Sequence, residues 1–447
     1  MIDSSPAAAP RQGLWPRARR AAEQTPDSRN RVVDFLRALS ILAVISGHWL
    51  LAAPWVDERG LALENLLQTE PWARWLTWCF QVMPVFFLVG GYANGVSWQA
   101  AMRDKKSYGE WLAGRLQRLI GPVLPLVVTW ALLGFIAGRL GVAPEIVRVG
   151  SQVALVPIWF LAVYIGVVLL VPVTCFVWQR LGFHSFWLLA LAALIDDALF
   201  FGADLEALGW LNYGFIWLAV HQLGYAWHGG QFSGALRTSI FGLGGLALLI
   251  GLVTVGPYPV SMVSVPGEAI SNSLPPKLPM LVLGIVQSAL LLALEGPLRR
   301  WLRRPVPWTA TILLNGMIMT IYLWHITAAA VVLGVALIAG NLGLGLTPGS
   351  GSWWAARPAW LVAYLLALVA LVPLVGRLER GRTGAAAVSA WRQASGALVV
   401  CVGLALLALG GVGGAGWLDL RLSAVLLPFS GAWLAGLLPP FPRARAT

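Results

Sequence analysis

The feature that most constrains this chain is a succession of long apolar runs that begins near residue 35 and continues almost to the C-terminus. A run of about 18 or more such residues is long enough to cross the hydrocarbon core of a bilayer as a helix. Only 11% of the residues are charged, whereas soluble domains carry about 25%. Membrane-spanning β-barrels show short alternating segments instead. The sequence therefore predicts an all-α polytopic membrane protein.

We expect about eleven transmembrane helices, at residues 33–53, 75–97, 118–138, 157–177, 184–203, 208–228, 236–256, 278–295, 309–339, 358–376 and 395–416. The ninth run is so long that its helix must tilt, kink or break. The apolar run 422–439 contains prolines and is either a short further crossing or an interfacial segment. The predicted organisation is a basic tail (1–30) without a signal peptide, a membrane domain (31–376), a basic loop (377–394), and an extra span with a tail (395–447).

The basic residues indicate the orientation of these spans. The N-terminal RARR and the loops with RDKK, RRWLRR and RLERGR fall on one side, and the other side is richer in acids. By the positive-inside rule, the N-terminus lies in the cytoplasm and the chain crosses the plasma membrane many times. The net charge of +12 then reflects topology and contact with anionic membrane lipids, and we expect no nucleic-acid partner.

The first predicted span carries two polar side chains that are unusual in lipid, Arg37 and His48. They are eleven residues apart, which places them on one face of a helix with His48 about 16 Å further along the axis. Ionisable groups inside membranes usually face a cavity or a partner. His48 is thus either a functional group or a hydrogen-bonded packing residue. Arg37, taken by itself, is explained by a long cationic side chain that extends to the polar membrane interface.

A second basic feature is the segment WLAGRLQRLIGPVLP, which places Arg115 and Arg118 three residues apart at the cytoplasmic end of the third span. Two guanidinium groups on one helix face suit phosphate groups, because each binds phosphate oxygens through paired N–H donors. Ordinary anchoring by the positive-inside rule explains the same pair.

These segments together resemble membrane acyltransferase family 3. RVVDFLRALSILAVISGHWL resembles its first span, which is marked by an Arg, ten residues and a His. QVMPVFFLVGGYANG, RLQRLIGPVLP, IWFLAVYIGVVLLVP and MTIYLWH resemble later family segments in the expected order. The resemblance covers roughly residues 30–376.

The resemblance implies a ten-helix core, to which this chain adds a C-terminal span. It also implies transfer of an acyl group, such as acetyl, from acyl-coenzyme A as co-substrate to a hydroxyl acceptor. On this reading Arg37, Arg115 and Arg118 hold the donor's phosphates and His48 is the catalytic base. The acceptor would be a cell-envelope glycan, a glycolipid or a secondary metabolite.

Further polar residues are candidates for the same chemistry. His325 lies at the same predicted depth as His48, and is either a second catalytic group or a packing residue. Asp196 and Asp197 orient a histidine or bind acceptor hydroxyls, or they simply end a helix. The polar loop 257–277 offers Glu268 and Asn272 to the acceptor or is a plain connection.

No metal is expected, because none of the five histidines clusters with acids at metal-ligand spacing. The three cysteines lie in separate apolar runs and form no CxxC motif. A competing function is a transporter or flippase for a polar lipid or intermediate, which would not consume a thioester. A non-catalytic scaffold would need neither the Arg-to-His face nor the arginine pair.

Overall fold

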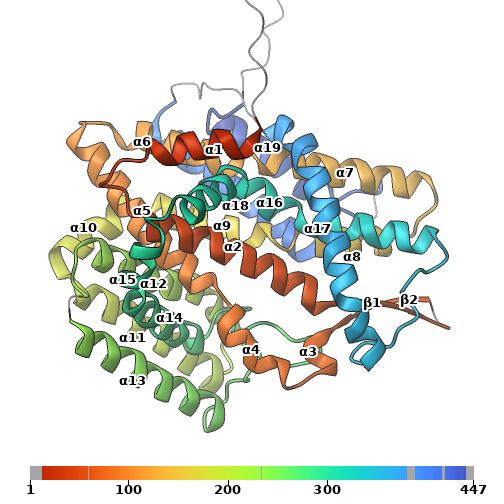
Figure 1. The fold of residues 1–447 in the computed structure, drawn as a ribbon, viewed down its shortest axis with the longest axis horizontal. Helices are drawn as coiled ribbons and strands as arrows, with labels where there is room; N and C mark the ends of the chain where they lie inside the picture. Colours follow the sequence, from red (N-terminus) through yellow and green to blue (C-terminus); the bar gives the residue numbers. More distant parts are fainter. Residues whose placement is uncertain (1–12, 59, 233, 380–387, 415–417, 439–447) are drawn as a thin grey trace, which may run out of the picture.

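The computed structural model describes residues 13–58, 60–232, 234–379, 388–414 and 418–438. The described chain is almost entirely helical, and its only named strands form the antiparallel hairpin β1 (Ala52–Asp57) and β2 (Gly60–Asn65) (Figure 1). The predicted all-α polytopic class is confirmed. Parts of the predicted tail, basic loop and C-terminal tail, at residues 1–12, 380–387 and 439–447, lie outside the described residues.

The helices follow one another in the order α1 (Leu14–Glu23), α2 (Arg31–Leu51), α3 (Leu66–Thr69), α4 (Ala73–Phe80), α5 (Met83–Arg103), α6 (Tyr108–Ile120), α7 (Val123–Arg139), α8 (Pro144–Leu155), α9 (Ile158–Leu169), α10 (Val171–Leu181), α11 (Phe183–Gly202), the 3₁₀ helix η1 (Glu206–Leu211), α12 (Asn212–His228), α13 (Ala235–Thr254), α14 (Leu278–Ala293), α15 (Glu295–Trp301), α16 (Pro305–Ile338), α17 (Gly351–Glu379), α18 (Ala390–Gly410) and α19 (Leu422–Leu434). Each of the eleven predicted spans overlaps one of them. Within the described residues, seven helical stretches are long and apolar enough to cross a membrane, or nine if two bent pairs each count as one span.

Three elements differ from the simple picture of straight spans. The predicted span 157–177 is divided between α9 and α10, because Pro172 in the first turn of α10 lacks an N–H donor and disfavours helical geometry before it. α9 instead pairs with α8 across a 50° bend. The ninth run forms the 34-residue helix α16, about 50 Å long against a core of about 30 Å, so it must tilt or extend beyond the hydrocarbon.

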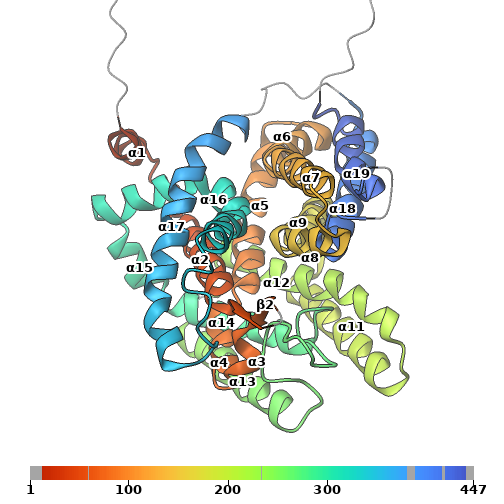
Figure 2. The same cartoon turned by 90° about the vertical axis from the view of Figure 1, so that its right-hand side faces the viewer.

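The C-terminal run 422–439 forms α19, with 13 residues. This helix is about 20 Å long, which is shorter than the hydrocarbon core. α19 packs against α18, and α18 in turn packs on α6, α8 and α9 (Figure 2). The extra span therefore belongs to the same bundle as the family-like helices rather than forming a separate unit.

Small residues let two central helices of the bundle approach closely. A Cβ added to Gly91 on α5 would lie 1.8 Å from the backbone oxygen of His221 on α12, and one added to Gly224 would lie 2.2 Å from that of Leu88. These distances are far below van der Waals contact, so glycine is required at both positions. Such small-residue contacts are a common way to pack helices in membranes.

The contact that positions the site is the one between α2 and α16. Arg37 near the start of α2 contacts Asn315, and His48 near its end contacts His325. From the first contact to the second, the residue numbers increase in both helices, so the two helices run parallel. We call the end of this helix pair near Arg37 the arginine end and the end near His48 the histidine end.

Candidate active site

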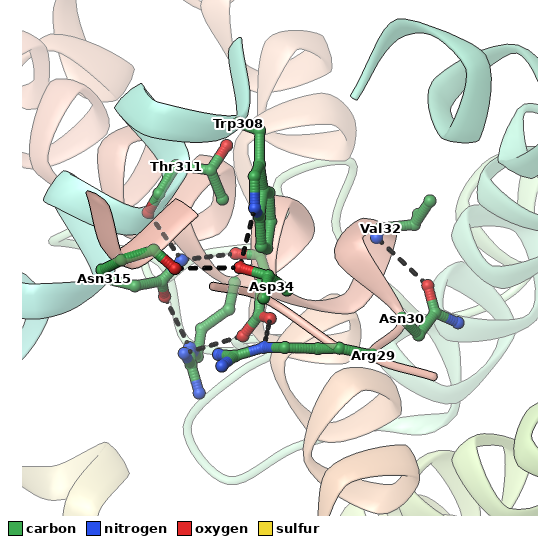
Figure 3. A network of polar contacts seen from close by, with 10 residues as sticks. Arg29, Asn30, Val32, Asp34, Trp308, Thr311 and Asn315 are labelled. Carbon is green, nitrogen blue, oxygen red and sulfur yellow. Dashed lines mark hydrogen bonds and ion pairs between the residues drawn. The ribbon is translucent and has the colours of Figure 1, made fainter. Parts of the chain in front are cut away.

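The arginine end begins with a capped helix. Asn30 precedes α2, and its side-chain oxygen accepts a hydrogen bond from the backbone N–H of Val32 at 3.1 Å (Figure 3). This is the usual way in which an asparagine satisfies an N–H group left free in the first helical turn. The cap fixes where α2 starts and thereby the depth and direction of Arg37.

Arg37 is held by two groups. Its Nη2 donates to the carboxylate of Asp34 at 3.1 Å, and its Nε donates to the side-chain oxygen of Asn315 at 2.8 Å. Asp34 is buried and also accepts from Arg29 at 2.6 Å, and this hydrogen bond raises the pKa of Arg29. Asn315 donates to the backbone oxygens of Asp34 and Thr311 (Figure 3). The side chain of Arg37 remains 38% exposed, so it is oriented but still accessible.

Two further guanidinium groups belong to the arginine end. Arg115 on α6 is half-buried, donates to Ser97 and to the backbone oxygen of Ala93, and lies beside the ring of Trp111. Arg115 is repelled electrostatically by both Arg118 and Arg37. Arg37 of α2 and Arg118 of α6 therefore both lie near enough to Arg115 to repel it. Closely spaced cations that do not pair with one another form a favourable site for an anion.

At the histidine end, His48 and His325 form a direct pair. Nδ1 of His48 lies 2.8 Å from Nε2 of His325, and Nδ1 of His325 lies 2.6 Å from the backbone oxygen of Tyr322. The rings are nearly parallel, at 9°, with centroids 5.1 Å apart. Because the two nitrogens are much closer than the centroids, the rings meet edge to edge in a hydrogen bond. His325 is fully buried, and His48 is half-buried.

The backbone oxygen of Tyr322 fixes the protonation pattern of both neutral rings. A carbonyl can only accept, so Nδ1 of His325 carries its proton and Nε2 of His325 is an acceptor. Nδ1 of His48 must then be the donor in the pair. Nε2 of His48 is left with a lone pair, and it makes no hydrogen bond to any residue that the structure describes. The arrangement is that of a base oriented by a second group.

The backbone beneath His48 is held from two sides. The indole N–H of Trp49 donates to the backbone oxygen of His325 at 3.0 Å. Arg357 on α17 is buried, and its Nη2 donates to the backbone oxygens of Trp49, Leu50 and Ala52. A cation at the carboxyl end of a helix satisfies carbonyls that have no partner within the helix. Arg357 was not among the residues predicted from the sequence.

Asp196 and Asp197 lie in a different part of the bundle from the histidine pair. Asp197 accepts hydrogen bonds from Asn212, from Tyr258 and from the backbone N–H of Leu278, at 2.7–2.9 Å. Both aspartates are buried, and neither is hydrogen-bonded to a histidine in the described chain. Asp197 therefore ties the loop 257–277 and the start of α14 to α11.

The other two predicted acceptor contacts belong to the loop 257–277. Glu268 forms an ion pair with Arg74 at 2.9 Å. Asn272 is fully buried, and its side chain donates to the backbone oxygens of Pro259 and Ser261. In this conformation Asn272 holds the loop together from inside.

The site also contains residues that sequence reasoning passed over. Asp34 lies three residues before Arg37, a spacing that places both on one helix face and was available as a signal. Asn315 was visible only as a polar residue within a span. Among the described residues, no group of three or more His, Cys, Asp or Glu side chains is arranged to hold a metal ion.

Comparison with known proteins gives the family of this chain. A family model described as an acyltransferase domain matches residues 30–377, which is most of the chain. Searches of curated proteins and of solved structures found no match. The matched segment contains both ends of the α2–α16 pair, and it makes the chain an enzyme rather than the alternative transporter. The chain belongs to acyltransferase family 3 and is a multi-pass membrane acyltransferase.

Proposed function

We propose that the enzyme transfers an acyl group, such as acetyl, from acyl-coenzyme A to a hydroxyl of a cell-envelope glycan, a glycolipid or a secondary metabolite. The observation that carries this proposal is that Nε2 of His48, which the hydrogen bond to His325 leaves as the basic nitrogen, has no partner among the described residues. The protein lies in the plasma membrane, and its N-terminus and arginine end face the cytoplasm, in agreement with the distribution of basic loops. Acyl-coenzyme A is made in the cytoplasm, so the donor reaches the enzyme from that side.

The arginine end supplies the binding site for the donor. Arg37, Arg115 and Arg118 bind the phosphates of coenzyme A, since guanidinium groups pair with phosphate oxygens more strongly than neutral donors do. Asp34 and Asn315 hold Arg37 in place before the donor arrives, which reduces the entropy lost on binding. From there the pantetheine arm extends along α2 toward His48, about three helical turns away.

The chemical step uses the lone pair of His48. Nε2 takes the proton from the acceptor hydroxyl while the hydroxyl oxygen attacks the thioester carbon, which gives a tetrahedral intermediate. The carbon–sulfur bond then breaks, and the imidazolium returns its proton to the departing sulfur, releasing coenzyme A with a free thiol. During this step Nδ1–H of His48 continues to donate to His325, so the second ring keeps the first in the reactive orientation.

The test uses membranes that contain the wild-type enzyme or His48→Ala, supplied with radiolabelled acetyl-coenzyme A and a crude envelope extract. His184→Ala is the matched control, because His184 is an exposed histidine bonded only to a local backbone oxygen among the described residues. We expect label in an envelope acceptor with the wild type and the control, and a large loss with His48→Ala. Equal labelling by all three would refute the role of His48, and no labelling by any would refute the donor or the acceptor class.

A further inference from the structure

A group of buried polar side chains lies between α5, α9 and α12 and takes no part in the proposed reaction. Asn94 of α5 and His221 of α12 are both fully buried. The side-chain Nδ2 of Asn94 donates to Nε2 of His221 at 3.1 Å and to the hydroxyl oxygen of Tyr164 on α9 at 3.3 Å. We call these three residues the Asn94 cluster. A histidine buried inside a membrane domain is a reason to look for a function.

The Asn94 cluster is only partly satisfied, so stability does not explain it. Because Nε2 of His221 accepts a hydrogen bond, Nδ1 carries the proton of the neutral ring. Neither this Nδ1 nor Oδ1 of Asn94 has a hydrogen-bond partner among the described residues. Each unpaired buried polar atom costs free energy, and apolar side chains of similar shape in place of both partners are often neutral for stability. A role in the function of the enzyme is the better explanation.

The adjoining face of α5 carries the groups that accept from Arg115. Arg115 donates to the backbone oxygen of Ala93 and to the hydroxyl of Ser97. These two acceptors lie one residue before and three residues after Asn94. Ser97 also accepts from the indole N–H of Trp111 at 3.1 Å and donates to the backbone oxygen of Asn94 at 3.2 Å. Successive helical residues point about 100° apart, so the rotation of α5 that satisfies the Asn94 cluster also presents both acceptors to Arg115.

Glycines leave this part of α5 with few side chains that interlock with its neighbours. Gly91 lies at the close crossing with α12, and a Cβ added to Gly90 would lie 2.8 Å from the ring of Tyr164. A helix surface of this kind permits close approach, whereas a hydrogen bond has a direction and fixes how the helix is rotated. Tyr164 also lies near enough to Arg115 to act on it electrostatically. The cluster and the guanidinium group are therefore neighbours.

We propose that the Asn94 cluster is a positioning unit for the donor site, which holds the α5 acceptors of Arg115 in place. Asp34 and Asn315 do the same for Arg37. The inference rests on the proposed function, because Arg115 is assigned there to the phosphates of acyl-coenzyme A. A guanidinium group that is already oriented loses less freedom when the donor binds. The cluster contacts neither substrate, so it acts on the binding of the donor's phosphates and not on the chemical step.

Binding of coenzyme A to the enzyme in lipid nanodiscs, measured by calorimetric titration, tests this role without acyl transfer. The double variant Asn94→Leu with His221→Leu should weaken binding about tenfold and unfold near the wild-type temperature. Tyr164→Phe, which removes a single hydroxyl, should weaken it about threefold. His221→Gln keeps an acceptor for the amide and should bind like the wild type. Gln222→Leu is the matched control, because buried Gln222 accepts from Ser185 across helices at 3.0 Å; it should bind coenzyme A normally.

A donor without phosphates separates positioning of Arg115 from a general disturbance of the bundle. S-Acetylpantetheine has the thioester and the arm but no phosphate. For the double variant, kcat/KM should fall about tenfold with acetyl-coenzyme A and stay unchanged with S-acetylpantetheine. The inference is overturned if the cluster variants bind coenzyme A like the wild type, or if they lose as much with the phosphate-free donor, and in both cases the proposed function stands. A wild-type enzyme that binds no coenzyme A would overturn the inference together with the proposed donor.

Discussion

Replacement of His325 by alanine tests the reasoning about the histidine pair most directly. His325 touches no substrate in our scheme, so it is a positioning residue for His48. The substitution removes the acceptor for Nδ1–H of His48. The ring of His48 is then free to rotate or to carry its proton on Nε2, and in either case the basic lone pair is no longer held toward the acceptor hydroxyl.

The size of the effect follows from the role of the base. A positioned general base contributes about 10²–10⁴-fold to a rate. Loss of its orientation should remove most of that factor, and we expect His325→Ala to lower kcat about 100-fold, equivalent to ~2.7 kcal/mol. His48→Ala should cost at least as much. The double variant should be no worse than His48→Ala, because the two rings act as one unit.

The assay is transfer of label from acetyl-coenzyme A, with KM and kcat determined separately. His325→Gln is the matched variant: its side-chain oxygen can still accept from His48, so it should retain more activity than His325→Ala. Thermal unfolding of each solubilised variant controls for the void left by a fully buried side chain. Full activity of His325→Ala, or costs that multiply in the double variant, would refute the paired arrangement.

Three further predictions concern binding and packing. Arg115→Ala should raise KM for acyl-coenzyme A about tenfold with little change in kcat, because one charge-assisted phosphate contact is lost; steady-state kinetics checks this, and an unchanged KM would contradict it. Arg357→Met should destabilise the protein by about 2 kcal/mol and lower kcat, since buried carbonyls at the end of α2 lose their donor; unfolding curves and kcat together test it. Gly224→Ala should abolish folded protein in size-exclusion profiles, because its Cβ would meet the backbone of α5, whereas Gly244→Ala, with open space around it, should behave as wild type.

The sequence predicted those features that depend on distance along the chain. Long apolar runs reveal membrane helices because every buried backbone group in lipid must be satisfied within its own segment. Helical periodicity likewise placed Arg37 and His48 on one face, and the structure confirms this because both contact α16. The family could be recognised because its motifs are short and local. The break between α9 and α10 was missed, although Pro172 marks it.

Only the tertiary structure decided which distant residues meet. His48 and His325 are 277 positions apart, and periodicity gives each residue a face on its own helix but not the helix that this face contacts. The same limit applies to Arg357 beneath α2 and to His221 beside α5. Such contacts depend on packing choices, including the close crossing at Gly91 and Gly224, that involve the whole bundle. The local sequence pattern can therefore identify the side chains of the site one by one, but only the packing of the helices brings them together.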